Sequence, residues 1–221
     1  MSVRVRFLYE KRGGACFVPH VALISIFTRA ALRAGLSLAM TEGFSPHPKM
    51  SFGPELPAGV VALAEPVDLW LEDAWIENAP FGQGELLSRW NGAMPEGFRL
   101  LRASLLPAGA PSLGRVCRAA LYWVRGAGTL RDGALLARAL EHYGGAVLDS
   151  ACGRDIEGDG RADWLSLVLD SPAQNGIGGW VRRMIADGDI AGWHELNIVR
   201  AAIGTWEKDA RRVGPPGGDI P

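Results

Sequence analysis

One segment restricts the folds open to this chain more than any other part of the sequence. Residues 43–59 are interrupted by prolines and glycines at Gly43, Pro46, Pro48, Gly53, Pro54, Pro57 and Gly59. Proline lacks the backbone N–H that a helix interior needs, and glycine loses more conformational entropy on folding than any other residue. The segment therefore cannot be a helix, and we expect a stiff extended loop with a short strand at residues 49–52.

Regular spacing before and after this loop predicts strands and helices. Val3, Val5 and Phe7 alternate with Arg4 and Arg6, which indicates a half-buried strand. A helix is expected to begin at a proline, whose missing N–H costs nothing in the first turn, and to end before a glycine. This helix spans residues 19–34. Similar patterns predict strands at residues 15–18, 36–41, 60–72, 98–105, 118–125, 164–170 and 196–203, and helices at 84–94, 130–143 and 179–187.

The order of these elements predicts the fold class. We interpret the chain as the order strand–helix–strand–strand–helix–strand followed twice. We therefore expect an α+β protein built from two ferredoxin-like βαββαβ-type units with antiparallel sheets. The first unit spans residues 1–106 and carries the proline-rich loop, and the second spans residues 112–207. Residues 208–221 are expected to form a disordered tail.

Composition and cysteine spacing exclude several classes of protein. Hydrophobic residues make up 48% of the chain and charged residues 21%, as in an ordinary globular protein. No apolar run reaches the roughly 18 residues of a spanning helix and the N-terminus lacks a signal peptide, so we expect a cytoplasmic protein with no membrane partner. Cys16, Cys117 and Cys152 are too far apart for a zinc ribbon or an iron–sulfur cluster. We therefore expect no metal and no cofactor.

Charge is distributed unevenly along the chain. The net charge is −1, but residues 1–53 hold seven Lys and Arg against two acidic residues, a balance of +5. Residues 54–96 hold one Arg against eight acidic residues, a balance of −7. The basic leading segment indicates a site for an anion such as RNA. Two oppositely charged solvated faces explain the same counts, and charge counting alone favours that simpler interpretation.

The most unusual residues lie inside the loop, in the run Gly-Phe-Ser-Pro-His-Pro-Lys of residues 43–49. Two prolines hold the backbone around His47 extended, and in an extended chain Lys49 lies on the same side as His47. Phe44 can pack the loop or stack a base. A stiff backbone with a cation and an imidazole suits phosphate binding, because little entropy is lost on contact. A structural turn, in which His47 binds a neighbouring carbonyl, fits the residues alone slightly better.

Other candidate residues lie on the first strand and the first helix. Arg29 and Arg33 recur on one helix face, and with Arg4 and Arg6 they complete the RNA- or phosphate-binding set that begins in the loop. His20 begins the helix, where backbone N–H groups favour anions, although a lone histidine there is more often structural. Acid–base cleavage of RNA by His20 and the loop histidine is a weaker candidate activity. A metal site would need a third ligand with no obvious candidate.

These residues give the first 70 or so positions a resemblance to a known family. Residues 4–7, 17–23, 33–36 and above all 42–54 resemble a radical SAM-associated domain family of unknown function. In that family the domain is often fused behind a radical SAM module or encoded separately as its companion. The resemblance therefore implies a radical SAM protein as partner, and ribonuclease and ribosomal-protein genes near family members imply tRNA or rRNA. The chain departs from the family at Pro19 and Ala22, where serine and aspartate are usual.

Three hypotheses follow. The first is an accessory or substrate-binding module that holds RNA for a radical SAM partner, and it requires the loop and the basic residues to converge on one surface. The second is a metal-independent ribonuclease or other acid–base enzyme, and it requires His20 and His47 to converge. The third is a purely structural protein-docking subunit, which predicts an exposed apolar patch and no cationic cleft. We rank them in this order.

Overall fold

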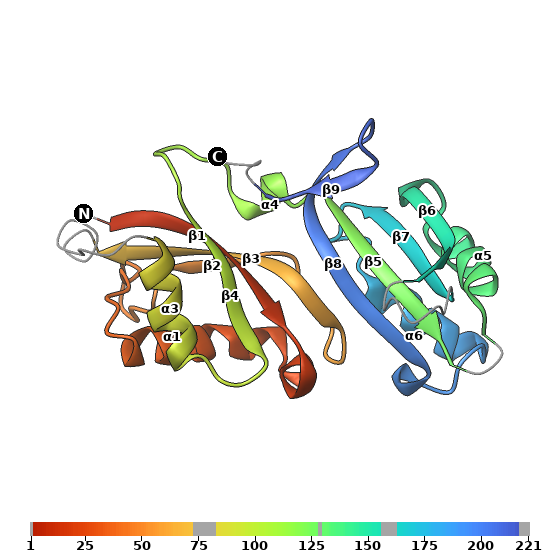
Figure 1. Ribbon diagram of the computed structural model, residues 1–221, viewed down its shortest axis with the longest axis horizontal. Helices are drawn as coiled ribbons and strands as arrows, with labels where there is room; N and C mark the ends of the chain where they lie inside the picture. Colours follow the sequence, from red (N-terminus) through yellow and green to blue (C-terminus); the bar gives the residue numbers. More distant parts are fainter. Residues whose placement is uncertain (1, 73–82, 128–129, 156–162, 217–221) are drawn as a thin grey trace.

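The computed structural model describes residues 2–72, 83–127, 130–155 and 163–216, which form two α+β units side by side (Figure 1). The alternating N-terminal residues form a strand as predicted, and the proline-started segment forms a short 3₁₀ turn that continues into a helix. The first unit consists of β1 (Ser2–Lys11), the 3₁₀ turns η1 (Gly13–Phe17) and η2 (His20–Ala22), α1 (Leu23–Arg33), β2 (Met50–Phe52), β3 (Val61–Glu72), α3 (Gln83–Ala93) and β4 (Phe98–Leu105).

The second unit follows after a short connecting helix and repeats the same order. It consists of α4 (Leu113–Val116), β5 (Ala119–Gly126), α5 (Asp132–Tyr143), η3 (Gly144–Ala146), β6 (Val147–Arg154), β7 (Trp164–Asp170), α6 (Ile177–Asp187), η4 (Trp193–Glu195), β8 (Leu196–Glu207) and β9 (Arg212–Gly214). Gly188, which follows α6, adopts the left-handed conformation (φ 78°) that ends many helices.

Strand order confirms the predicted fold class. The sheet runs β4-β1-β3-β8-β5-β7-β6, with β2 also paired to β3. Each unit taken alone therefore has the antiparallel order of a ferredoxin-like βαββαβ fold, with its first strand between its fourth and third. The units join where β3 and β8 pair in parallel, Val61 with Val199 and Ala62 with Arg200.

Each unit buries its own core between helices and one face of the sheet. In the first unit, the rings of Phe7 and Trp90 meet edge-on with centroids 5.0 Å apart, and those of Tyr9 and Phe27 do the same. In the second unit, Trp180 lies with Leu135 and Leu167 in a core that also takes in Leu56 and Val60 from the end of the proline-rich segment. The proline-rich segment therefore belongs to both units.

Three local predictions are wrong. Residues 15–18 lie in and after the turn η1 instead of a return strand, and residues 36–41 make only isolated bridges, Leu38 to Leu71 and Met40 to Pro48. The predicted tail is partly ordered, because β9 pairs with β8 and buries Val213. Its last residues, 217–221, lie outside the described residues.

A further strand, β6, was not predicted. It lies at the edge of the sheet and its side chains are half-buried or exposed, so it lacks the apolar alternation that identifies a strand. Within the described residues, no helix combines the length and the apolar character needed to cross a membrane.

Candidate functional site

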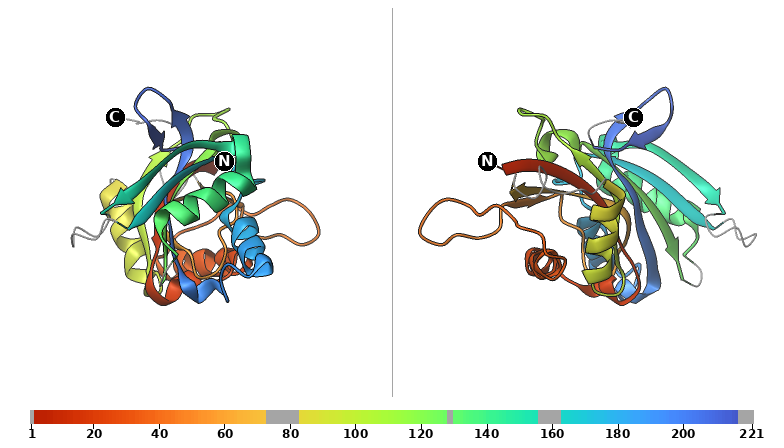
Figure 2. Two further views of the ribbon diagram at one scale, coloured as in Figure 1. Left: turned by 90° about the vertical axis from the view of Figure 1, so that its right-hand side faces the viewer. Right: turned by 60° about the vertical axis from the view of Figure 1, so that its left-hand side comes forward.

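The loop of residues 41–48 projects from the first unit and is held at its base by hydrogen bonds (Figure 2). The Thr41 N–H donates to the His47 carbonyl at 2.8 Å, and the His47 N–H donates to Thr41 Oγ1 at 3.1 Å. Just below, the Lys49 N–H donates to the Ala39 carbonyl at 2.7 Å. Gly43, near the tip, has a positive φ of 121°, which other residues rarely adopt. The predicted stiff loop is therefore a hairpin-like segment that projects from the first unit into solvent.

Three predicted site residues lie on this loop or at its base. Phe44 is fully exposed at the tip. His47 is exposed, and its Nδ1 lies 3.1 Å from Thr41 Oγ1 and 3.3 Å from the Ser45 carbonyl, so described contacts of the ring use Nδ1 and none uses Nε2. The Lys49 ammonium lies 5.0 Å from the centre of the Trp70 ring, a cation–π contact that leaves the residue exposed. The loop thus displays an aromatic ring, an imidazole and a cation.

Arg4 and Arg6, predicted to bind RNA, are instead held inside the protein. Both guanidinium groups bind the buried carboxylate of Asp68, through Arg6 Nε at 2.7 Å and Arg4 Nε at 3.0 Å. They also donate to the carbonyls of Ala110 and Pro111, in the segment between the units. Arg4 is half-buried and Arg6 is buried, because the connecting segment covers the strand face that alternation turns away from the helices, and their assignment to RNA binding stays a prediction.

The two arginines of α1 have different surroundings. Arg33 is exposed, but its Nη2 donates to the Ala93 carbonyl at 2.5 Å and so satisfies the end of α3. Arg29 is exposed, and no described residue forms an ion pair or hydrogen bond with it. No described contact joins either arginine to the loop. The convergence that the first hypothesis requires is therefore not found, and the loop remains as its candidate site.

His20 is half-buried beside the end of β2, away from the exposed tip of the loop. Its ring meets Phe52 edge-on with centroids 5.8 Å apart. Burial lowers the pKa of His20 below its usual value, with the Glu55 carboxylate opposing that shift. No described contact joins His20 to His47, so the pair required for acid–base cleavage of RNA is not assembled.

A buried ion pair at the junction of the units was missed by the sequence analysis. Arg200 Nε donates to Glu65 Oε1 at 2.7 Å, and both residues are buried. The same guanidinium donates to the carbonyls of Pro54 at 2.8 Å and Glu55 at 3.2 Å. The available signal was the presence of charged residues inside two largely apolar strands, Glu65 and Asp68 in β3 and Arg200 in β8, since buried charges are normally paired. This pair binds the proline-rich segment to the second unit.

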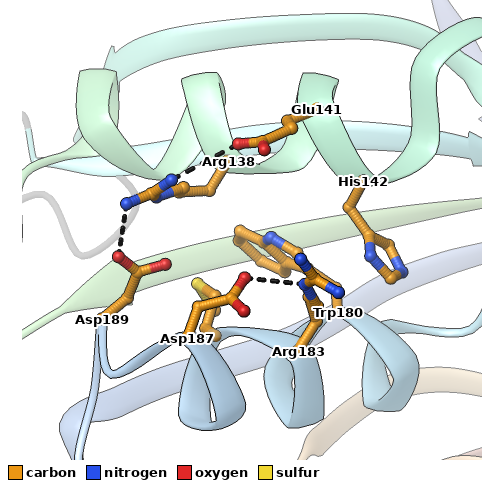
Figure 3. Close-up of a pocket in the computed structure, with 8 residues that line it drawn as sticks. Arg138, Glu141, His142, Trp180, Arg183, Asp187 and Asp189 are labelled. Atoms are coloured by element: carbon orange, nitrogen blue, oxygen red, sulfur yellow. Dashed lines mark hydrogen bonds and ion pairs between the residues drawn. The ribbon is translucent and has the colours of Figure 1, made fainter.

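The second unit has a hollow of about 300 Å³ between α5 and α6 (Figure 3). Its floor includes Trp180, whose Nε1 has no partner among the described residues, as is true of two other buried indoles. Its cations are paired, Arg138 with Asp189 at 2.5 Å and Arg183 with Asp187 at 2.7 Å. The hollow therefore offers no free cation to an anionic ligand.

Metal-ligating and thiol groups are scattered. Among the residues that the structure describes, no three His, Cys, Asp or Glu side chains group in a way that could hold a metal ion. Cys16 and Cys117 are buried, and burial raises the pKa of the Cys117 thiol to about 12. Cys152 is exposed on the edge strand β6, apart from both.

The protein belongs to the class of α+β proteins built from two ferredoxin-like units joined edge to edge. A hydrogen-bonded loop projects from the first unit. The sequence from residue 4 to residue 148 matches the profile of DUF2344, a family described as an uncharacterized protein conserved in bacteria. Because the match spans well over half of the chain, the protein belongs to that family. Membership in a family of unknown function is thus confirmed, and the radical SAM association stays a prediction.

Comparison with other proteins adds no function. No curated protein matches the sequence. A crystal structure of an unknown protein from Galdieria sulphuraria is similar over 90% of this chain and 96% of its own, with 10% identity and a TM-score of 0.28. The acetolactate synthase small subunit from Thermotoga maritima is similar over 90% and 94%, with 9% identity and a TM-score of 0.26. Likenesses this distant carry no argument about fold or activity.

Proposed function

We propose that the protein is an accessory subunit that binds RNA, or another phosphate-bearing substrate, and presents it to a radical SAM enzyme. The observation that carries this proposal is the displayed loop. A phenylalanine that is fully exposed at a loop tip gives up the stabilisation of burial, and a stacked base would cover it. His47 lies on the same loop and Lys49 at its base, and they supply an imidazole and a cation for the backbone phosphates of a bound strand.

The partner enzyme is the second part of the proposal. It rests on the resemblance of residues 42–54 to a radical SAM-associated family, and on the absence of cluster-ligand spacing among the three cysteines. A chain without such ligands needs a second protein to generate a radical. The hydrogen-bonded base of the loop supports a presenting role, because a preorganised loop loses little entropy when it binds.

The test is RNA binding measured by fluorescence anisotropy with labelled tRNA and ribosomal RNA fragments over a salt series. We expect Phe44→Ala to weaken binding about tenfold, within the range measured for loss of one base stack. We expect the double variant His47→Ala/Lys49→Ala to weaken binding and to make it less salt-dependent, by about 0.7 in the slope of log K against log salt for a lost phosphate contact.

Lys208→Ala provides the matched control, because Lys208 is an exposed lysine in the turn between β8 and β9. It should leave both the affinity and the salt slope unchanged. Wild-type protein that fails to bind any of these RNAs at low salt would disprove the RNA part of the proposal. RNA cleavage seen on a gel of the same samples would favour the acid–base enzyme instead.

A further inference from the structure

The outer side of α1 exposes large apolar side chains that have no partner in a monomer. Val21 is 79% exposed and Leu32 is 67% exposed, and Ile24 lies between them at 43%. Ile24, Thr28 and Leu32 recur at intervals of four residues and so lie on one side of α1, and Val21 lies in the turn η2 that leads directly into the helix. The opposite side is the one buried in the core, with Leu23, Phe27, Ala30 and Ala31.

The apolar surface continues past the start of α1 to the seam between the units. Phe17, at the end of η1, is 73% exposed and borders a hollow of about 520 Å³. The second unit lines the same hollow with Trp193 of η4 and with Leu196 and Ile198 of β8. Figure 1 shows α1 along the lower side of the first unit. We call Phe17, Val21, Ile24, Leu32 and Trp193 the α1 face.

The charges beside the α1 face indicate which kind of molecule binds there. Between Leu23 and Arg33 the helix contains no acidic residue, and Arg29 and Arg33 are both exposed. Arg29 forms no described ion pair, so its charge is available to a carboxylate. An RNA backbone would need cations where the α1 face has Val21 and Leu32, and would leave those side chains unburied. A protein surface with apolar side chains beside Asp or Glu satisfies both features.

We infer that the α1 face is the docking site for an amphipathic helix of the radical SAM companion, with an apolar stripe flanked by acidic residues. Side chains at intervals of four residues, such as Ile24, Thr28 and Leu32 of α1, form a ridge that packs into the groove between the ridges of a second helix. Contiguous exposed apolar residues on a soluble domain mark such interaction sites. The inference rests on the companion named in the proposed function, and it assigns the companion a face separate from the RNA-binding loop.

The test is the affinity of the purified chain for a radical SAM protein of the same organism, measured by biolayer interferometry. Leu32→Glu places a carboxylate in the apolar stripe and against the acidic flank, and should weaken the complex at least tenfold. Leu140→Glu is the matched control, because Leu140 is also an exposed leucine on a helix, α5, in the other unit. It should change the affinity less than twofold. Circular dichroism and thermal unfolding should show both variants folded.

Hydrogen exchange of the wild-type complex should add protection at residues 17–33. A complex that forms and is weakened equally by Leu32→Glu and Leu140→Glu would overturn the docking site while leaving the accessory function intact. Failure of the wild-type chain to bind the companion would instead overturn the accessory function itself. Self-association that Leu32→Glu abolishes would reassign the α1 face to a second copy of the chain. RNA binding lost in Leu32→Glu would reassign it to RNA.

Discussion

The two units share one order of strands and helices but differ in the connection between the first helix and the second strand. In the second unit this connection is η3 alone, residues 144–146 between α5 and β6. In the first unit it covers residues 34–49 and includes the displayed loop (Figure 2). A connection of three residues shows that the fold does not need the longer one. Leu36 and Leu38 of this connection belong to the core of the first unit, and the proposed function assigns binding to its exposed residues 42–47, since loops on a rigid scaffold commonly carry function.

The cations beside the hollow of the second unit differ from those near the loop and on α1 of the first unit. In the second unit, Arg138 and Arg183 are neutralised by carboxylates across or along α5 and α6 (Figure 3). In the first unit, Arg29 has no described partner and Lys49 has only the ring of Trp70. Ion-paired cations have little attraction left for a new anion. The binding site of the proposed function accordingly lies in the first unit, and the buried pair of Glu65 and Arg200 joins that unit to the second.

The largest effect should come from breaking the junction between the units. Arg200→Met leaves the buried Glu65 carboxylate without its cation and the carbonyls of Pro54 and Glu55 without their donor. We expect the free energy of unfolding to fall by about 3–5 kcal/mol, the usual cost of an uncompensated buried charge. Urea denaturation measures this loss.

Two further variants calibrate that measurement. Arg183→Ala removes an exposed pair within one helix and should cost less than about 0.5 kcal/mol. The double variant Arg200→Met/Glu65→Gln should recover part of the loss, because no isolated charge remains. A loss near that of Arg183→Ala would mean that water reaches Glu65 and that the junction does not hold the units together.

The second prediction makes the first unit resemble the second. Replacement of residues 41–48 by the Gly-Gly-Ala of residues 144–146 removes the exposed tip and keeps β2 and α1. We expect RNA affinity to fall at least tenfold, since the aromatic ring and the imidazole are both lost. The melting temperature should change little, because residues 42–47 are exposed and none of residues 41–48 lies in the core of the first unit. Anisotropy titration and thermal unfolding measure the two quantities, and a large loss of stability would instead indicate a structural loop.

Those strands and helices could be predicted whose apolar residues recur at regular intervals within the element itself. The strand at residues 98–105 and the helix ending at Tyr143 were placed correctly, because apolar spacing and flanking glycines lie within the element. β6 could not be, because an edge strand is half-exposed and its pattern is weak. Neither could the junction, since Glu65 and Arg200 are 135 residues apart in sequence and their pairing depends on the tertiary fold.

The candidate site could be predicted in part for the same reason. Phe44, His47 and Lys49 lie on one stiff loop, so their display follows from local prolines and glycines. The burial of Arg4 and Arg6 could not be predicted, because alternation shows that two side chains share a strand face, but it does not show what covers that face. Here the cover comes from the connecting segment at Ala110 and Pro111, more than a hundred residues away in sequence.

The third prediction concerns pH. Burial lowers the pKa of His20 in the folded state below its usual value of 6.5. Between these two values the unfolded chain binds more protons than the folded one, so stability is full above about pH 6.5 and falls as the pH drops through the folded pKa. His20→Gln should remove that part of the acid-side loss, measured by urea unfolding at about pH 7.5 and pH 5. His194→Gln, at an exposed histidine, should leave it in place. Equal loss in both variants would show that His20 is not desolvated.

The smallest predicted effect separates the two binding faces of the first unit. Arg29 borders the α1 face and has no described contact with the loop, so Arg29→Ala should leave RNA affinity and its salt slope within error. Binding of the radical SAM companion should weaken only about two- to fivefold, mainly through a slower association rate, as is usual for a charge at the rim of an interface. Stopped-flow association at low and high salt measures this change, and Arg183→Ala is the matched control. A reduced RNA salt slope in Arg29→Ala would instead place α1 within the RNA site and merge the two faces into one.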